Sequence, residues 1–599
     1  MKRFALSACW VLAATALLFA VTAAFEYLRF DDHDYTFRCR FVFDGLSAAN
    51  VREAFLSVRH AGIWMPLTYL SYMCDISFFG AGPAAHHAAN VALHVVNTCL
   101  LLVLAGRLLR SGKTGPGWGA VLAAAAVAFW ALHPQRVEAV AWIASRKELL
   151  WAFFALLGVI CWDRRGCGAF GWVGSAVCGV CACMSKPTGL CFPLLLLCWE
   201  ALCKREGETA RRRLGPCWFW GILLTASVAT AALAAYSQTH AEGYVPRALF
   251  SASFPWRMLN AAVALGLSLW SLIVPTGIYL DYRAVPGAFP LHGVTGLAVC
   301  AAALTCLAVC GIGAWRKRPG RGVCWLVLGA AAWYLAALAP TLGIFGSFGE
   351  QARADRFLYV PSMGVTLGAV AVMGRVRRPF GEWVAERLFR FGEWLLLAAV
   401  LAGGIVSTWP VLMSYRNDYT AFSRTLAFDP DHGRALAHVA SEACARLGRI
   451  DRGIALFRRS QALRPRDDTA AQLAYALAMR GRSEDFAEIR RLCAKFACDH
   501  RLDVKGQALE ALGMTALRQR RWAEAASCLE DSIRAPRRFY SPEDARLRLA
   551  AAYCNGGRTQ EAVRVLKELT RSPRHDIRGK ADQALRTLTN NPHALLFFD

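Results

Sequence analysis

The feature that most constrains the fold of this chain is a series of apolar stretches of membrane-spanning length in its first two-thirds. A helix of roughly 20 apolar residues crosses the hydrocarbon core of a bilayer with every backbone hydrogen bond satisfied internally. From residue 415 onward the pattern changes, and charged and apolar residues alternate at helical spacing. We therefore predict an all-α chain, with a polytopic membrane domain over residues 1–414 and a water-exposed helical domain over residues 415–599. The apolar segments cover residues 4–25, 86–108, 116–132, 149–162, 169–184, 189–203, 214–236, 257–279, 290–314, 323–342, 358–374 and 392–414.

The distribution of lysine and arginine predicts which ends of these segments face the cytoplasm. Because cytoplasmic loops are enriched in basic residues, the N-terminus is expected inside and residues 415–599 outside. Such a topology needs an odd number of spans, so we interpret 257–279 as re-entrant and expect about eleven spans. The first segment lacks a good cleavage site, which favours an uncleaved span over a secretory signal. The basic clusters are Lys2-Arg3 and those at 107–113, 163–165, 204–213 and 375–378.

The net charge of +25 could suggest nucleic-acid binding, and the 22 cysteines could suggest a redox or zinc site. The positions of these residues in the sequence argue against both. A basic surface patch would indicate nucleic-acid binding, but here the charge lies in short loops between apolar segments, so we expect no nucleic-acid partner. Cys178 and Cys181 have the CxxC spacing of redox and zinc sites. They lie inside an apolar segment without a second pair, so we interpret them as small apolar residues that pack in the membrane.

An acidic run at residues 30–35, with the sequence FDDHDY, follows the first apolar segment at the predicted outer surface. Two interpretations are open, a solvated loop that ends a helix or the floor of an active site outside the membrane. Polar residues recur at the same face of later segments, which favours the active site. We predict Asp32 as the general base and Asp31 as its neighbour in ligand or metal binding, with the reverse assignment open. His33 and Asp34 are further candidates.

Polar residues also mark the second span, residues 86–108. His86, Asn90, His94 and Asn97 are separated by four, four and three positions, so they share one helical face. Such a face contributes to a site or forms a polar seam against another helix. His87, Asn90 and His94 are kept as site candidates. The preceding residues 47–82 are too polar to span and suit short helices in the outer interface.

Several charged residues lie on the predicted outer side, where the positive-inside bias would not place basic ones. An anionic ligand is the simplest reason for them, because arginine and lysine bind phosphate and carboxylate groups. These residues are Arg136, Glu138, Arg146, Lys147, Lys186, Arg353, Asp355 and Arg356.

The second domain contains a repeat. Gly448, Gly481, the Arg520-Arg521 pair and Gly557 each fall at a turn between two amphipathic helices, at separations from 33 to about 40 residues. This is close to the 34-residue tetratricopeptide period, and such helix pairs stack into an α-solenoid. The alternative is an irregular helical domain. The units cover residues 434–465, 467–496, 506–536 and 543–573, of which the second is degenerate, with Phe486 where a small residue is expected.

With these residues in view, the chain resembles the transmembrane and tetratricopeptide-repeat-containing O-mannosyltransferases and their bacterial relatives, which belong to the GT-C glycosyltransferase superfamily. The similarity covers nearly the whole chain, a multi-span domain followed by repeats. Arg353, Phe357 and Leu358 depart from the expected pattern, and the second repeat is poor. The stretches that carry the resemblance are 31–35, 64–68, 87–94, 133–147, 185–187 and 354–361.

The resemblance implies transfer of mannose or a similar hexose from a polyprenyl-phosphate carrier to a protein acceptor hydroxyl on the outer side of the membrane. It implies a multi-pass protein of the bacterial inner membrane whose periplasmic repeats hold the protein acceptor. The residue chemistry agrees, since attack by a hydroxyl needs a general base and a leaving phosphate needs cations. A divalent metal such as Mg²⁺ or Mn²⁺ is left open, because no residues form a convincing metal cage. The candidate ligands of the donor phosphate are Arg136, Arg146, Lys147, Lys186, Arg353 and Arg356.

Two functions of other classes are also open. One is a membrane-anchored scaffold or assembly factor whose repeats bind partner proteins, which would need no charged outer loops. The other is a lipid-linked glycan flippase, polymerase or ligase, which shares the lipid-phosphate substrate. The latter is expected to carry polar residues across the bilayer, whereas polar residues here lie mainly at the outer ends of the spans.

Overall fold

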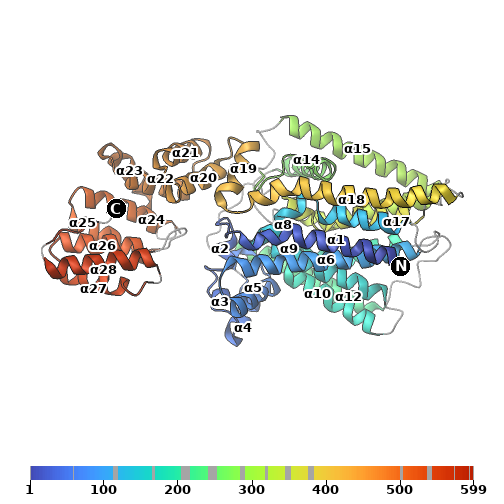
Figure 1. Ribbon diagram of the computed structural model, residues 1–599, viewed down its shortest axis with the longest axis horizontal. Coiled ribbons are helices and arrows are strands. Elements are labelled where there is room, and N and C mark those ends of the chain that lie inside the picture. The colour runs from blue at the N-terminus through green and yellow to red at the C-terminus, as the bar shows by residue number, and fades with distance from the viewer. Residues whose placement is uncertain are drawn as a thin grey trace. The chain divides into compact units, whose positions relative to one another are not determined.

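The computed structural model of the chain is helical and divides into two compact units, Met1–Ala421 and Phe422–Asp599 (Figure 1). Within the described part of the chain the elements are helices and no strand occurs, so the predicted all-α class is confirmed. The described residues are 2–58, 60–111, 119–164, 169–203, 216–240, 253–282, 290–316, 321–344, 353–375, 383–498, 504–535, 542–572, 574–591 and 594–597. Of the predicted basic clusters, 204–213 lies wholly outside these residues, and those at 107–113, 163–165 and 375–378 lie partly outside them.

Eight helices of the described residues are long and apolar enough to cross a membrane, which fits a multi-pass membrane protein. A bent pair, α7 (Ala120–Ala131) with the following helix Pro134–Ala141, would make a ninth span. The 51° bend falls at Pro134, which cannot donate a backbone hydrogen bond. The eight are α1 (Lys2–Ala20) with η1 (Val21–Ala24), α6 (Pro83–Ser111), α12 (Cys217–Thr239), α14 (Phe254–Ile273), α15 (Pro290–Trp315), α16 (Arg321–Leu338), η9 (Asp355–Leu358) with α17 (Pro361–Met373), and α18 (Trp383–Ser414).

The region interpreted as re-entrant from the sequence differs in the structure. α14 is one unbroken helix of 20 residues, and the chain bends instead between α7 and η3 (Pro134–Arg136). Conflicting basic loops on either side of 257–290 suggested a re-entrant segment, but helix continuity depends on local sequence. Residues 254–273 contain no proline after Pro255, which lies in the first turn where proline is tolerated.

Three predicted spans form shorter helices, α9 (Arg146–Asp163), α10 (Ala169–Ser185) and α11 (Phe192–Cys203). α9 and α10 pack closely because Gly158 and Gly179 leave room for the ring of Phe192. A Cβ atom would lie 2.5 Å from the ring at Gly158 and 2.6 Å from it at Gly179. Cys178 is buried beside Gly158, as expected for a packing residue. This packing holds the first turn of α9, which carries three charged residues of the site.

The segment between α1 and α6 forms short helices, as predicted for residues 47–82. They are α2 (Asp32–Tyr35), α3 (Arg40–Phe43), α4 (Ala48–Leu56), η2 (His60–Gly62) and α5 (Pro66–Phe79). α4 begins at an N-cap, where the Ser47 hydroxyl accepts a hydrogen bond from the Asn50 backbone N–H at 3.1 Å. The end of α5 exposes Phe78 and Phe79, which suits a position at a membrane interface.

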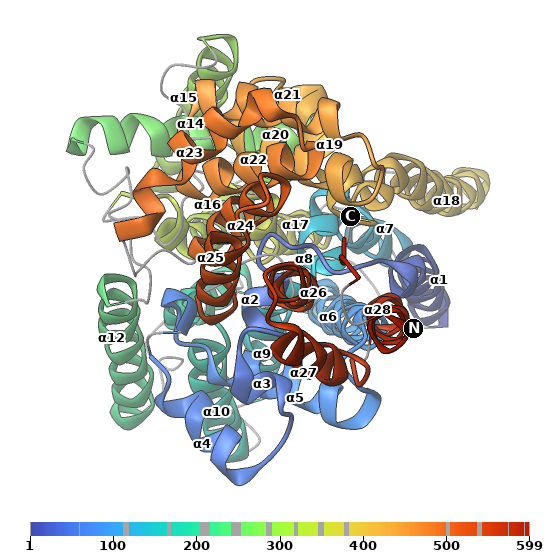
Figure 2. The same ribbon diagram turned by 90° about the vertical axis from the view of Figure 1, so that its left-hand side faces the viewer.

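The second unit consists of successive helix pairs, and each helix contacts its neighbours along the chain (Figures 1 and 2). The predicted turns all lie between helices and share a left-handed backbone, with φ of 61° at Gly448, 74° at Gly481, 57° at Arg520 and 80° at Gly557. Pro536 and Pro573, which close two predicted units, lie outside the described residues. The helices are α20 (Gly433–Ala445), α21 (Ile450–Leu463), α22 (Asp467–Arg480), α23 (Phe486–Cys498), α24 (Lys505–Arg518), α25 (Trp522–Arg534), α26 (Pro542–Asn555), α27 (Thr559–Leu569) and α28 (His575–Asn590).

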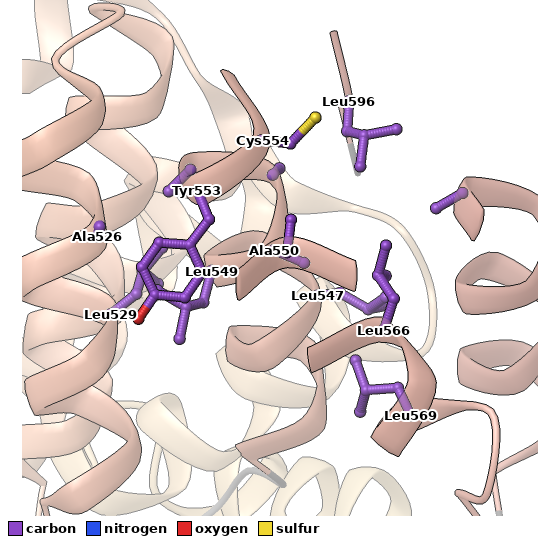
Figure 3. Close-up of a cluster of buried hydrophobic side chains, with 14 of the residues drawn as sticks. Ala526, Leu529, Leu547, Leu549, Ala550, Tyr553, Cys554, Leu566, Leu569 and Leu596 are labelled. Atoms are coloured by element: carbon purple, nitrogen blue, oxygen red, sulfur yellow. The ribbon is translucent and has the colours of Figure 1, made fainter. Parts of the chain in front are cut away.

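The buried faces of these pairs supply the core. Around α26 the core consists of small and aliphatic side chains, among them Leu549, Ala550 and Leu566 (Figure 3). A second cluster, which includes Phe457, Leu477 and Ile489, lies among α20 to α24. Because each pair buries its apolar face against the next one, the pairs are stable only as a stack.

The turn at Arg520 allows a test of the repeat alignment. Arg520 is exposed and adopts the left-handed backbone that glycine occupies at the other three turns, where a side chain costs about 1–2 kcal/mol. Replacing Arg520 with glycine should therefore raise the free energy of unfolding of this unit by about 0.5–1 kcal/mol, after the entropic cost of glycine. Denaturant unfolding measures this change. Gly557→Ala is the matched control and should destabilise, and the alignment fails if both changes act in the same direction.

Candidate active site

Asp32 is a buried anchor that joins the acidic run to the segment before α9. Its side chain is fully buried, and Oδ2 accepts a hydrogen bond from the Leu28 N–H at 2.8 Å while Oδ1 accepts one from the Ala144 N–H at 2.8 Å. Burial raises the pKa of Asp32 well above its usual range, and the negative charges of Asp31 and Asp418 act in the same direction. The two backbone N–H groups oppose this shift. Both carboxylate oxygens are therefore already used by the fold.

Asp31, the residue before α2, has a different environment. It is half-buried, and its negative charge attracts those of Lys147 and Arg356. A partly exposed carboxylate beside two cations can meet a substrate, whereas a fully buried one with two backbone partners cannot do so without rearrangement. Asp31 is therefore more accessible to a ligand than Asp32, and the sequence had left open which of the two is the general base.

The other two candidates of the acidic run have local partners. Asp34 forms an ion pair with Arg38 at 2.6 Å, and its backbone carbonyl lies 2.9 Å from Nε2 of His60. The ring of His33 is edge-on to those of Tyr27 and Phe37. Burial lowers the pKa of His33 to about 4, helped by the charges of Arg38 and Arg29, so this imidazole is neutral at neutral pH. These contacts shape the acidic run.

Two lysines line a cavity with mostly apolar walls. Lys147, in the first turn of α9, donates a hydrogen bond to the Tyr35 hydroxyl at 3.0 Å and lies 4.3 Å from the centre of that ring. Lys186, between α10 and η6 (Pro187–Cys191), forms an ion pair with Glu148. The space between its lining atoms is about 600 Å³, a figure that includes space open to the surroundings. Its other walls include Ile63, Pro187, Leu190, Ala234, Gln238, Pro340 and Phe357, so the candidate spans Cys217–Thr239 and Arg321–Thr341 both reach it.

The charged segment before α17 is tied to the segment after α7. Arg356 forms an ion pair with Glu138, and its backbone N–H donates to the same carboxylate at 3.0 Å. The guanidinium of Arg356 lies 4.9 Å from the ring of Trp142. Nearby, Asp355 accepts a hydrogen bond from the Tyr282 hydroxyl and lies 3.5 Å from Arg353. These four predicted site residues therefore have charged partners inside the protein. Of the four, Arg356 also interacts with the negative charge of Asp31.

The polar face of α6 is used for helix packing. His86, Asn90, His94 and Asn97 are all fully buried. Asn90 accepts a hydrogen bond from Nε of Arg146 at 2.8 Å, and Nδ1 of His94 lies 2.7 Å from the Tyr359 hydroxyl. His87 is buried against the ring of Phe25. This geometry fits the seam alternative, in which the polar side chains join α6 to α9 and α17.

Arg136 and Arg146 also have hydrogen-bond partners within the fold for most of their donors. Arg136 is fully buried and donates to Ser362 Oγ at 2.7 Å and to the Leu358 and Tyr359 carbonyls at 3.1 and 3.2 Å. Arg146 forms an ion pair with Asp75 at 2.5 Å. Of the six predicted phosphate ligands, Lys147 and Lys186 are the two that line the cavity.

Sequence analysis missed several residues that build this site, namely Asp75, Tyr35, Trp142 and Glu148. Asp75 could have been found, because a single carboxylate in the apolar helix PLTYLSYMCDISFF is expensive unless it is paired. Tyr35 and Trp142 give no comparable signal, since aromatic residues are common at membrane interfaces. In the part of the chain that the structure describes, no three histidine, cysteine or carboxylate side chains converge as a metal-binding group.

Comparison with known proteins gives partial matches to protein O-mannosyl-transferases. The chain is 36% identical over 104 residues to protein O-mannosyl-transferase Tmtc1 of Drosophila melanogaster, which covers 17% of this chain and 11% of the relative. It is 31% identical over 134 residues to TMTC2 of Homo sapiens and 29% identical over 139 residues to TMTC1 of Mus musculus. Each of these covers 21% of this chain, and 15% and 14% of the relative respectively. No family model and no solved structure matches the chain. The similarity to protein O-mannosyl-transferases spans less than a sixth of the length of the curated relatives that the chain matches.

Proposed function

We propose that this protein transfers a hexose, such as mannose, from a polyprenyl-phosphate carrier to a hydroxyl group of a protein acceptor on the outer side of the membrane. The observation that carries the proposal is the cavity in which Lys147 and Lys186 meet apolar walls from candidate membrane spans. A lipid phosphate has the matching chemistry, because its head is anionic and its chain is apolar. The partial likeness to protein O-mannosyl-transferases supports the sugar and the acceptor.

The residues can perform the transfer as a single displacement. The acceptor oxygen attacks the anomeric carbon of the hexose while its proton moves to the carboxylate of Asp31. The bond from the anomeric carbon to the phosphate oxygen breaks, and its electron pair leaves with the polyprenyl phosphate. Lys147 and Lys186 stabilise the negative charge that grows on this phosphate. Arg356, already neutralised by Glu138, orients the segment around Asp31.

The remaining predicted residues have supporting roles in this proposal. Asp32 fixes the loop that carries Asp31, and Arg146 holds the first turn of α9, which carries Lys147. Arg136 ties the segment after α7 to the start of α17. Arg353 and Asp355 belong to the network with Tyr282. A divalent metal stays open, and the scheme as written assigns the proton and the leaving phosphate to residues of this chain.

The proposal includes a GT-C-like arrangement of the spans, a bacterial inner-membrane location, and tetratricopeptide repeats on the periplasmic side that bind the protein acceptor. It is supported by the basic N-terminus, by the regular left-handed turns of the second unit and by the extended surfaces typical of helical repeats.

A reporter enzyme that is active only in the cytoplasm should stay silent when fused after Asp599. Activity of that reporter would put the repeats on the other side.

A direct assay tests the proposed function. The purified full chain in detergent is given a polyprenyl-phosphate hexose and a periplasmic protein fraction, and hexose on serine or threonine is detected by mass spectrometry. We expect transfer to protein. Extension of a lipid-linked glycan instead would favour the polymerase or ligase class, and no transfer with any hexose donor would favour the scaffold.

Removing the positive charge of Lys147 should weaken donor use without unfolding the protein. Lys147 donates its hydrogen bond to the uncharged Tyr35 hydroxyl at 3.0 Å, and the methionine side chain keeps the apolar stem of the lysine, so we expect Lys147→Met to fold. Loss of one group that stabilises the leaving oxygen typically costs about 10²–10³ in rate, and we expect kcat/KM for the donor to fall accordingly. Lys147→Arg, which keeps the charge, should lose less. Unchanged kcat/KM in Lys147→Met would exclude a phosphate at this end of the cavity.

A further inference from the structure

The last helix pair of the second unit binds an extended segment of its own chain. Asn555, the last residue of α26, donates from Nδ2 to the carbonyl of Leu596 at 2.8 Å and accepts at Oδ1 from the Leu596 N–H at 2.8 Å. Residues 594–597 contain no helix or strand, and the Ala594 carbonyl accepts from the thiol of Cys554 at 3.2 Å. One amide side chain thus pairs with both backbone groups of one residue. Asn555 therefore binds the main chain of the segment, and the side chain of the bound residue takes no part in these hydrogen bonds.

A single side chain anchors this segment. Leu596 is 5% exposed and belongs to the buried cluster of α26, α27 and α28 (Figure 3). Its neighbours are left in solvent, with Leu595 57% and Phe597 67% exposed. The alternation is that of an extended peptide that places every second side chain on the surface that binds it. Leu596 is therefore the one side chain of residues 595–597 that the cluster buries.

Asn555 lies two residues before Gly557, the left-handed turn residue of its helix pair. The other three pairs have no amide at the corresponding position, where the residues are Arg446, Met479 and Arg518. Arg518 donates to the carbonyls of Ala478 at 2.7 Å and Met479 at 3.4 Å, so it binds the end of an earlier helix. Asn555 instead offers one donor and one acceptor with the spacing of an extended backbone. The other three side chains do not have this pairing capacity.

We propose that the end of α26, with Asn555 and the apolar cluster in which Leu596 is buried, is a binding site for an extended peptide that carries an aliphatic side chain. Residues 594–597 occupy this site as a displaceable intramolecular ligand. A short tether gives such a segment an effective concentration in the millimolar range, so an outside peptide binds weakly until the segment leaves. The site is independent of sugar transfer, because it is defined by binding alone.

Peptide binding to the full chain in detergent tests this site. The probe is a fluorescent synthetic peptide with the sequence of residues 591–599, and binding is followed by anisotropy. A chain lacking residues 591–599 should bind the probe at least about tenfold more tightly than the intact chain, because the tethered competitor is gone. Asn555→Ala in the shortened chain should weaken binding about tenfold or more. Asn590→Ala, an exposed amide at the end of α28, is the matched control and should leave binding unchanged.

A second variant tests the proposal if the shortened chain fails to fold. Leu596→Asp in the intact chain should release the segment, since a carboxylate is costly in an apolar cluster, and should bind the probe like the shortened chain. The same substitution in the probe should abolish its binding. Equal binding by the intact and shortened chains, or no effect of Asn555→Ala, would overturn the proposal. Unfolding of both variants would also overturn it, because residues 594–597 would then be part of the core.

Discussion

Replacing Asp31 with asparagine is expected to lower the turnover of hexose transfer by about two to four orders of magnitude, because the acceptor hydroxyl loses its general base. Asparagine has nearly the same shape but cannot take a proton at neutral pH. Asp31 is half-buried and its carboxylate faces two cations, so the fold should survive the change. The measurement is kcat with saturating donor, together with the thermal unfolding midpoint of the purified protein.

Asp32→Asn is the matched control for this experiment. Both oxygens of Asp32 accept backbone N–H groups in a fully buried position, and an amide would turn an N–H group toward one of these donors. An unsatisfied buried group costs about 1–3 kcal/mol, so Asp32→Asn should lower stability more than Asp31→Asn does. The assignment is wrong if Asp31→Asn turns over normally, or if Asp32→Asn alone loses activity at unchanged stability.

The course of the helices could largely be predicted from the sequence. Apolar runs of spanning length gave the membrane helices because the bilayer leaves the backbone few alternatives. The turns at Gly448, Gly481 and Gly557 could be predicted because glycine adopts the left-handed backbone that ends these helices. The bend at Pro134 and the continuity of α14 were missed, since charge counts over loops carry no information about a break within a helix.

The sequence indicated which residues are candidates for the site, but it did not indicate the role of each. The charged residues at the ends of the predicted spans were found because charge is rare there. Which of them are neutralised inside the fold depends on contacts between distant segments, such as Arg356 with Glu138 or Asp32 with the Ala144 N–H. Neighbours in the sequence therefore differ in role. Asp31 and Asp32 are adjacent, yet one is partly exposed and the other is a buried anchor.

Arg146 and Lys147 are likewise adjacent in the sequence but differ in role. Replacing Arg146 is expected to give the largest change in stability. The side chain of Arg146 is 1% exposed and forms an ion pair with Asp75 at 2.5 Å. Arg146 also donates to Asn90 Oδ1 and to the His86 carbonyl, each at 2.8 Å. Arg146→Met would leave the carboxylate of Asp75 buried with His86 as its neighbour at 2.7 Å. Breaking a buried ion pair on one side costs about 3–5 kcal/mol, and we expect a loss of unfolding free energy of that size.

Two further variants separate the charge effect from the loss of packing. Asp75→Asn combined with Arg146→Met removes both charges and should recover most of the loss, since a buried pair and a neutral pair of similar volume differ little in stability. Arg107→Met breaks an ion pair with Asp163 at 2.7 Å whose side chains are 13% and 33% exposed, and it should cost at most about 1 kcal/mol. Equal losses in Arg146→Met and Arg107→Met would contradict the prediction, as would a double variant no more stable than Arg146→Met. Because Arg146 fixes the start of α9, its loss should also raise KM for the donor through the neighbouring Lys147.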